Sequence, residues 1–494
     1  MGDPLQSDPV LNVRNLSVSF GKGEGKLQAL DGVSLSVGRG EIRALVGESG
    51  CGKSVTMMAI LGLLPLKSAS IEADSIHLGD TDLRSARPSL LRSIRGRRIG
   101  MIFQDPMTSL TPVHTVGYQI GEGLRQHFKM SRNEARSRAL DLMDLVRIPA
   151  PRSRLNAYPH ELSGGMRQRV MIAMALACNP ELLIADEPTT ALDVTVQAQI
   201  LNLISDLRDE LGMSVVLITH DLGVVAAAAD SVSVMYAGRI VEEAPVHEIF
   251  RNPTHGYTAG LLHEKPPDRR GLGMNTATPL IEVRQVSRSF PVGRTLLGKP
   301  RNTVRALDGI DLELRRGETL GLVGESGCGK STLARLLVAL DQPSSGDVVF
   351  EGHCLNRLSR RKLRKERKRI QMIFQDPLAS LNPRMTVRAS IAEPLGNFLP
   401  QAGVDADDLV DDLALQVGLS LHHLDRFPHE LSGGQCQRVG IARAIVSSPD
   451  VIVADEPVSA LDVSIQAQIL NLLFDIKDRM GLSMIFVSHD LSVV

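Results

Sequence analysis

The ten-residue stretch LVGESGCGKS stands at Leu45–Ser54 and again, unchanged, at Leu322–Ser331. Its G-x-x-x-x-G-K-S spacing suits a phosphate group, because the glycines let consecutive backbone N–H groups turn inward around phosphate oxygens. The helix expected after each loop adds the positive end of its dipole. The lysine of the pattern neutralises the β- and γ-phosphates, and the serine supplies a hydroxyl to Mg²⁺. A chance glycine-rich turn is the alternative, and two copies at matching positions argue against it. The predicted phosphate-binding residues are Gly47, Glu48, Ser49, Gly50, Cys51, Gly52, Lys53 and Ser54 in the first copy and Gly324, Glu325, Ser326, Gly327, Cys328, Gly329, Lys330 and Ser331 in the second, with Ser54 and Ser331 as Mg²⁺ ligands.

The rest of the chain repeats in the same order, which indicates a duplicated domain. The separation between copies is 277 residues at the two loop lysines and 271 at Gln104 and Gln375, and it then holds at 269 through the later motifs. A constant separation means that the structure between the motifs is the same in both copies. The recurring segments are MIFQDP at Met101 and Met372, PHELSGG at Pro159 and Pro428, ADEP at Ala185 and Ala454, and HDL at His220 and His489.

Composition also marks the boundary between the copies. Residues 263–279, HEKPPDRRGLGMNTATP, are rich in proline, glycine and charge and lack an apolar period, so they are predicted to be a linker. The first domain is therefore placed at residues 8–262 and the second at 280–494. The second copy has five residues after its HDL histidine, and we expect it to be truncated at its C-terminus, because an α/β domain that stopped there would expose a sheet edge.

Each copy alternates short apolar runs with helical patterns. IRALVG, ELLIAD and SVVLIT have the form of buried parallel strands. Residues Lys53–Leu64 and Gly164–Ala177 are predicted to be helices. The expected core of each domain is a doubly wound α/β sheet.

Each ADEP segment places two adjacent acids at the end of an apolar strand. Successive strand residues point to opposite sides, so the two carboxylates can take different tasks. Asp186 and Asp455 are predicted to hold the Mg²⁺ shell, and Glu187 and Glu456 to orient or deprotonate an attacking water. Such a pair, taken alone, is more often a helix cap or a turn, but its place behind a phosphate-binding loop favours the catalytic interpretation.

The LSGGM and LSGGQ segments each begin a predicted helix. Their serines are N-cap residues, and the glycines allow close approach, so several free N–H groups face outward. A capped helix is the plain alternative, but two exposed glycines after the cap weaken a helix, which suggests that the backbone is offered to an anion such as a γ-phosphate. The predicted ligands are Ser163, Gly164 and Gly165 in the first copy and Ser432, Gly433 and Gly434 in the second.

Two polar residues per copy follow further apolar strands. His220 and His489 stand at matching positions beside the expected γ-phosphate, although a histidine after a strand is more often structural. Gln104 and Gln375 end a short strand and are predicted to contact Mg²⁺ or the attacking water. We assign all four to the catalytic set.

The phosphate loop, FQDP, LSGG, ADEP, ALD and a late histidine, in this order, resemble the ABC ATPase family over nearly the whole chain. The resemblance implies two tandem P-loop NTPase domains, each with a parallel-sheet core, a β-subdomain and a helical subdomain, that bind ATP and Mg²⁺ and hydrolyse ATP. It also implies composite sites, in which the loop of each half meets the LSGG helix of the other. Phe20 and Phe290 match the aromatic residue that stacks on adenine in this family, although a phenylalanine at a strand end is more often part of a core.

Within that family the chain is most similar to peptide/nickel importer ATPases. The markers are residues 105–120, 376–387 and 252–262, the last reading NPTHGYTAGLL. The resemblance implies peptide import at the cytoplasmic face of the inner membrane, with two integral-membrane permease subunits and an extracytoplasmic solute-binding protein. Glutathione, nickel and opines are alternative solutes. Met166 and Cys436 depart from the usual signature, but both catalytic glutamates remain, so two competent ATP sites are expected, with asymmetry between them as the alternative. No cysteine lies between Cys178 and Cys328, which leaves no ligands for the iron–sulfur cluster that some relatives carry after this segment.

Composition argues against other classes. Aromatic residues make up 3% of the chain and the net charge is −1, so a base-stacking nucleic-acid platform is not expected. The basic run at 357–369 is predicted to be a solvated helix face. No apolar stretch is long enough to span a bilayer. A soluble twin-ABC ATPase acting on ribosomes is the alternative from another class, but its relatives usually have a long charged linker.

Overall fold

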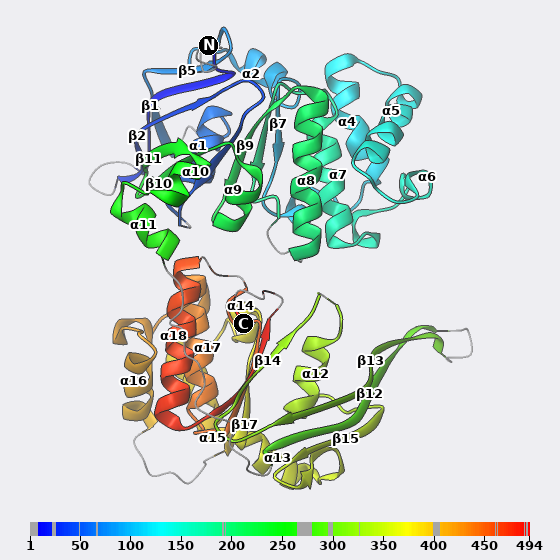
Figure 1. Cartoon of the computed structure of the whole chain (residues 1–494), viewed down its shortest axis with the longest axis vertical. Coiled ribbons are helices and arrows are strands. Elements are labelled where there is room, and N and C mark those ends of the chain that lie inside the picture. Colours follow the sequence, from blue (N-terminus) through cyan, green and yellow to red (C-terminus); the bar gives the residue numbers. More distant parts are fainter. Residues whose placement is uncertain are drawn as a thin grey trace. The chain divides into compact units, whose positions relative to one another are not determined.

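The structure is a computed structural model of residues 1–494, and it describes all of them except 1–7, 22–25, 49, 66–67, 190–191, 193, 264–278, 295–299, 326, 399–405, 460, 462, 489 and 491–492. The chain divides into two compact units, Met1–Glu264 and Lys265–Val494 (Figure 1). The predicted linker lies almost wholly outside the described residues.

A parallel sheet forms the centre of the first unit. Its strand order is β11-β10-β3-β9-β8-β7, with β11 antiparallel at the edge and the others parallel. β8 and β9 are buried along their whole length, which explains their unbroken apolar sequences: helices cover both faces of a parallel sheet. The strands are β3 (Ile42–Val46), β7 (Ile99–Ile102), β8 (Leu182–Asp186), β9 (Ser214–Thr219), β10 (Ser231–Tyr236) and β11 (Arg239–Pro245).

An antiparallel sheet in the same unit corresponds to the expected β-subdomain. β1 pairs with β2, β4 and β5, and β5 pairs with β6. Its inward side chains share one buried cluster with helix α1 and with residues of the parallel sheet. The strands are β1 (Leu11–Phe20), β2 (Leu27–Val37), β4 (Ala69–Glu72), β5 (Ser75–Leu78) and β6 (Thr81–Asp82).

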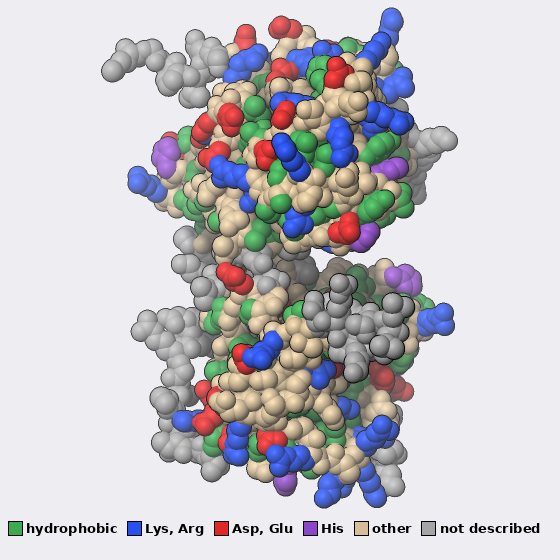
Figure 2. Space-filling model, turned by 90° about the vertical axis from the view of Figure 1, so that its right-hand side faces the viewer, with side chains coloured by type: hydrophobic (Ala, Val, Ile, Leu, Met, Phe, Trp, Pro, Cys, Tyr) green, Lys and Arg blue, Asp and Glu red, His purple; other side chains and the backbone are tan. Residues whose placement is uncertain are grey.

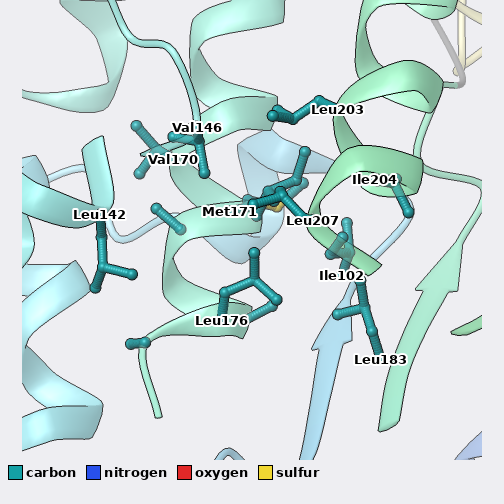
Figure 3. Close-up of a cluster of buried hydrophobic side chains, with 14 of the residues drawn as sticks. Ile102, Leu142, Val146, Val170, Met171, Leu176, Leu183, Leu203, Ile204 and Leu207 are labelled. Carbon is teal, nitrogen blue, oxygen red and sulfur yellow. The ribbon is translucent and has the colours of Figure 1, made fainter. Parts of the chain in front are cut away.

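Helices α4, α5 and α6 form a group beside α7 and α8 in the first unit (Figure 1). Apolar side chains from α5, α7, α8, β7 and β8 meet in one buried cluster, which includes Leu142, Met171, Ile102 and Leu207 (Figure 3). The helices of this unit are α1 (Lys53–Ile60), α2 (Pro88–Ile94), α3 (Pro106–Ser109), α4 (Val116–Phe128), α5 (Arg132–Leu145), α6 (Pro151–Arg154), α7 (Gly164–Leu176), α8 (Val194–Leu211), α9 (Leu222–Ala228), α10 (Val246–Arg251) and α11 (Gly256–His263).

The second unit repeats this plan. Its parallel sheet has the order β14-β19-β18-β17, and its antiparallel sheet the order β13-β12-β15-β16. The strands are β12 (Ile281–Arg294), β13 (Pro300–Leu314), β14 (Thr319–Val323), β15 (Ser345–Phe350), β16 (His353–Cys354), β17 (Ile370–Ile373), β18 (Val451–Asp455) and β19 (Ser483–Ser488). The helices are α12 (Lys330–Leu337), α13 (Arg360–Arg369), α14 (Pro377–Ser380), α15 (Val387–Phe398), α16 (Ala406–Gln416), α17 (Gly433–Ile445) and α18 (Val463–Met480).

The predicted fold class is confirmed, but one helix end is wrong. The sequence predicts a helix over Lys53–Leu64, whereas α1 ends at Ile60 with Leu61 as its C-cap. Gly62 has a φ of 61°, a left-handed conformation that ends helices. The N–H of Leu63 then turns back to the carbonyl of Met58, at 2.8 Å, so this peptide group is satisfied without a further helical turn.

The charged surface fits the prediction of a solvated basic run. Helix α13 contains no buried residue. On the face drawn in Figure 2, Lys and Arg side chains are interspersed with Asp and Glu. None of the described helices is both long and apolar enough to cross a membrane.

One carboxylate ties strand β11 to the start of α11. Glu242 accepts hydrogen bonds from the N–H and hydroxyl of Thr254, at 2.7 and 2.8 Å, and from the N–H of His255, at 3.1 Å. Burial raises the pKa of this carboxyl, but hydrogen bonds from Thr254, Thr258 and His255 outweigh burial and lower its pKa to about 2. Glu242 therefore fixes the NPTH segment to the sheet.

Acid is expected to loosen this link. Because the folded pKa of Glu242 is depressed, its contribution to stability is present above the unfolded value of 4.5 and is lost as pH falls from there towards about 2. Urea unfolding at pH 6, 4 and 3 measures the loss. Glu242→Gln is expected to flatten that part of the pH curve, and Glu248→Gln, an exposed site on α10, is the control. An unchanged slope in Glu242→Gln would contradict the assignment.

Candidate nucleotide-binding and hydrolysis sites

The first phosphate loop joins β3 to α1, where the sequence placed it. Lys53 is buried, with 6% of its surface exposed, and its ammonium donates to the carbonyls of Gly47 and Glu48 at 2.7 and 2.8 Å. The loop thus curls around the charge that the sequence assigns to phosphate. Gly52 caps α1 in a left-handed conformation with a φ of 111°.

The loop is closely packed from behind. A Cβ on Gly47 would lie 2.2 Å from the carbonyl oxygen of Met235, and one on Gly52 would lie 2.5 Å from a methyl carbon of Leu30. The N–H of Gly238 donates to the carbonyl of Cys51 at 3.0 Å. Neighbouring backbone and side-chain atoms therefore occupy the space that a side chain at Gly47 or Gly52 would need.

The carboxylate assigned to Mg²⁺ has the chemistry that the ion needs. Asp186, at the end of β8, is 4% exposed and is hydrogen-bonded to the side chain of Ser54. Its Oδ1 is buried and has no hydrogen-bond partner among the described residues, and burial raises its pKa. A buried acceptor beside a serine hydroxyl fits a hard cation, which prefers oxygen ligands. Asp186 and Ser54 are thus suited to hold Mg²⁺.

Glu187 lies between the two other predicted catalytic side chains. Its Oε2 accepts from Nε2 of Gln104 at 2.7 Å, and its Oε1 lies 3.1 Å from Nδ1 of His220. These residues follow β8, β7 and β9, which are neighbours in the sheet, so their carboxyl ends bring the three together. Glu187 has a φ of 47°, a costly conformation for a non-glycine residue that often marks a functional site.

The second unit repeats these contacts. Lys330 donates to the carbonyls of Gly324 and Glu325 at 2.6 and 2.8 Å. Ser331 donates to Oδ1 of Asp455 at 3.2 Å, and burial raises the pKa of that carboxyl. Glu456 accepts a hydrogen bond from Gln375 at 2.8 Å, and the ammonium of Lys330 lies 3.9 Å from its carboxylate. Its φ of 46° matches that of Glu187.

Both signature serines cap their helices. Ser163 accepts from the N–H of Met166 at 3.4 Å, and Ser432 accepts from the N–H of Gln435 at 3.3 Å. In α17 the side chain of Gln435 also accepts from the N–H of Ser432, at 3.0 Å, which completes a capping box. The thioether of Met166 is a poor acceptor for the N–H of Ser163. Met166, which departs from the family pattern, therefore leaves α7 without the reciprocal bond of a capping box. Gly164 and Gly433 open the two helices, followed by Gly165 and Gly434.

Completing this box is expected to stabilise the first unit. Met166→Gln adds an acceptor for the N–H of Ser163, and the expected gain in the free energy of unfolding is about 0.5 kcal/mol. The reciprocal change, Gln435→Met, is expected to cost the second unit a similar amount. Urea unfolding of both variants measures the two effects, and changes of the same sign would contradict this explanation.

The thiol of the first phosphate loop is buried. Cys51 is 7% exposed, and burial raises its pKa. Met235 belongs to the same buried cluster, and the N–H of Gly238 donates to the carbonyl of Cys51. Strand β10 and the turn after it therefore cover this part of the loop.

Several predicted residues are placed less fully. Ser49, Ser326 and His489 lie outside the described residues. Phe20 ends β1 and packs partly against the core, while the ring of Phe290 lies 4.8 Å from the guanidinium of Arg288. Their adenine-stacking roles stay predictions. Sequence reasoning missed Tyr257, whose hydroxyl accepts a hydrogen bond from the N–H of Glu48 at 3.1 Å.

Comparison with known proteins shows the family. The sequence matches the ABC transporter family over residues 30–190 and 307–459. It is 48% identical over 526 residues to the glutathione import ATP-binding protein GsiA of Pectobacterium atrosepticum, covering 99% of this chain and 84% of that protein. The Escherichia coli K12 protein of the same name is 46% identical, covering 100% and 84%. A dimeric ATP-binding cassette, MJ0796, solved with ADP and phosphate, aligns at 30% identity with a TM-score of 0.43, covering 48% of this chain and 98% of that one.

The chain therefore belongs to the ABC transporter family and is an ATPase coupled to transport, with ATP and Mg²⁺ as its cofactors. Within the family it is a peptide/nickel-type importer ATPase with two nucleotide-binding domains, similar along its whole length to the glutathione import ATP-binding proteins. As an importer's ATP-binding subunit, it works with membrane and solute-binding partners.

Proposed function

We propose that this chain energises the import of small peptides, and that glutathione is the first solute to test. The observation that carries this proposal is the identity of 46–48% along the whole chain to proteins named for glutathione import. Glutathione is a tripeptide and so belongs to the class that the sequence markers indicate. Nickel and opines are the competing solutes, because selectivity resides in other subunits.

The proposed assembly has separate parts. This chain contributes ATP-binding domains at residues 8–262 and 280–494, joined by residues 263–279. Two integral-membrane permease subunits form the path for the solute, and an extracytoplasmic binding protein delivers it. The chain itself docks on the cytoplasmic face of the membrane.

The proposed chemistry is in-line attack of water on the γ-phosphate, which breaks the bond to the bridging oxygen and releases ADP and phosphate. Lys53 would leave the carbonyls of Gly47 and Glu48 to pair with the phosphates, and Asp186 with Ser54 would hold Mg²⁺. When bound, Mg²⁺ draws charge from the phosphate oxygens. Glu187 orients the water and takes its proton. Lys330, Ser331, Asp455 and Glu456 have the same roles in the second domain.

Gln104 and His220 position Glu187 in this scheme. Their contacts at 2.7 and 3.1 Å hold its two carboxylate oxygens from different sides. His220 also gives the site a group able to contact the γ-phosphate. Gln375 and His489 are assigned the same parts in the second domain.

Stimulated ATP hydrolysis tests the solute. Proteoliposomes that carry this chain with its cognate permease are supplied with binding protein loaded with glutathione, a dipeptide, an oligopeptide, a nickel chelate or an opine. We expect glutathione or another peptide to stimulate phosphate release. Stimulation by nickel or an opine alone would overturn the peptide assignment. Sedimentation of the chain with ribosomes and not with membranes would favour the ribosomal alternative.

A further inference from the structure

A contact from the far end of the first unit reaches the phosphate loop. The hydroxyl oxygen of Tyr257 accepts a hydrogen bond from the N–H of Glu48 at 3.1 Å, between residues 209 positions apart. Glu48 is the second residue of the loop, and Tyr257 lies in the first turn of α11. The proposed hydrolysis scheme gives no task to the NPTHGYT segment (252–258), which Glu242 fixes to the sheet.

Tyr257 is held in place by its surroundings. Its ring centroid lies 4.4 Å from that of Tyr236, with an angle of 39° between the planes. Its N–H donates to Nδ1 of His255 at 3.2 Å. Glu242 in turn fixes Thr254 and His255 to strand β11. The hydroxyl is therefore presented to the loop from a rigid base, and burial raises the pKa of Tyr257 to about 12, so the phenol stays neutral at physiological pH.

Glu48 is held through both of its backbone groups. Tyr257 accepts from its N–H, and the ammonium of Lys53 donates to its carbonyl at 2.8 Å. When ATP binds, Lys53 is needed by the phosphates and releases that carbonyl. The bond to Tyr257 uses the N–H of Glu48, which Lys53 does not contact, so the movement of Lys53 does not break it. It can hold Glu48 in both states.

We propose that Tyr257 is a positioning residue of the first ATP site, where its hydroxyl fixes the opening of the phosphate loop so that the following N–H groups face the nucleotide. This inference rests on ATP binding at that loop. An ordered loop does not have to be organised by the ligand, so losing the hydroxyl weakens nucleotide binding. One neutral hydrogen bond corresponds to about a fivefold change in affinity.

Titration of the full-length chain with a fluorescent ATP analogue and Mg²⁺ tests the proposal. Lys330→Ala disables the second loop, so that binding at the first site is measured alone. Lys53→Ala disables the first loop, so that binding at the second site is measured alone. Tyr257→Phe is expected to raise Kd about fivefold in the Lys330→Ala background and to leave Kd unchanged in the Lys53→Ala background. Tyr236→Phe, which removes a hydroxyl from the stacked partner, is the matched control and is expected to change neither value.

Steady-state hydrolysis gives a second measurement. With both lysines intact, Tyr257→Phe is expected to raise KM for ATP while kcat at saturating ATP is kept, and a general loss of folding would lower kcat instead. An unchanged first-site Kd, or an equal weakening of both sites, would overturn the proposal. If the Lys330→Ala parent bound no nucleotide, the ATP site itself would be refuted, and this inference with it.

Discussion

Replacing Glu187 by Gln is expected to lower ATP turnover about a hundredfold, the scale of a lost general base. The amide keeps the size of the side chain and can still meet Gln104 and His220, but it cannot take a proton from water. Glu456→Gln is expected to have a similar effect, and the double variant to abolish turnover. Phosphate release by membranes carrying the complete importer measures all three variants.

Two controls define what this result means. Glu210→Gln changes an exposed carboxylate near the end of α8 and is expected to keep full activity. Nucleotide binding by the Glu187→Gln variant is expected to survive, since the phosphate loop is untouched. A silent Glu187→Gln beside an inactive Glu456→Gln would show that the halves are unequal and would refute the symmetric assignment.

Gly52→Ala is expected to cost the first unit about 3 kcal/mol of unfolding free energy and to remove nucleotide binding at its loop. The residue has a φ of 111°, and a Cβ there would lie 2.5 Å from a methyl carbon of Leu30 and 3.1 Å from the carbonyl of Ala29. The added methyl must therefore displace the loop or strand β2. Urea unfolding and titration with the ATP analogue measure the two losses.

Gly50→Ala separates the cost of a left-handed backbone from the cost of crowding behind the loop. Gly50 also has a positive φ, 78°, but a Cβ there meets nothing within 4 Å. Its expected cost is only that of a left-handed non-glycine residue, about 1 kcal/mol. Gly329→Ala repeats the crowded case in the second unit, where the carbonyl of Ala306 would be 2.5 Å away. Equal costs for Gly50→Ala and Gly52→Ala would show that packing behind the loop is unimportant.

Sequence alone predicted the fold class and the membership of the ABC family, because both depend on short local patterns. The loop at Leu45–Ser54 needs glycines at fixed places, and the ADEP acids follow an unbroken apolar strand. Once the strands are parallel neighbours, their ends meet at one edge of the sheet. That geometry brings Gln104, Glu187 and His220 together, although their catalytic roles stay predictions until the variants are measured.

Other features depend on packing between distant segments, which no local pattern encodes. The bond from Glu48 to Tyr257 joins residues 209 positions apart, and a tyrosine in a family marker does not reveal which backbone group it meets. The end of α1 at Ile60 was missed because an apolar run continues through Leu64. Gly62 and Pro65 were the signals that could have marked the earlier end.

The cover over Cys51 makes this thiol a chemical probe of the first loop. With Cys328→Ser and Cys354→Ser in place, the cysteines that remain are all buried. A bulky maleimide should therefore modify Cys51 slowly in the intact loop, and faster where Gly52→Ala displaces it. Loosening of this nucleotide site could thus be timed by a chemical reaction, without introducing a new cysteine.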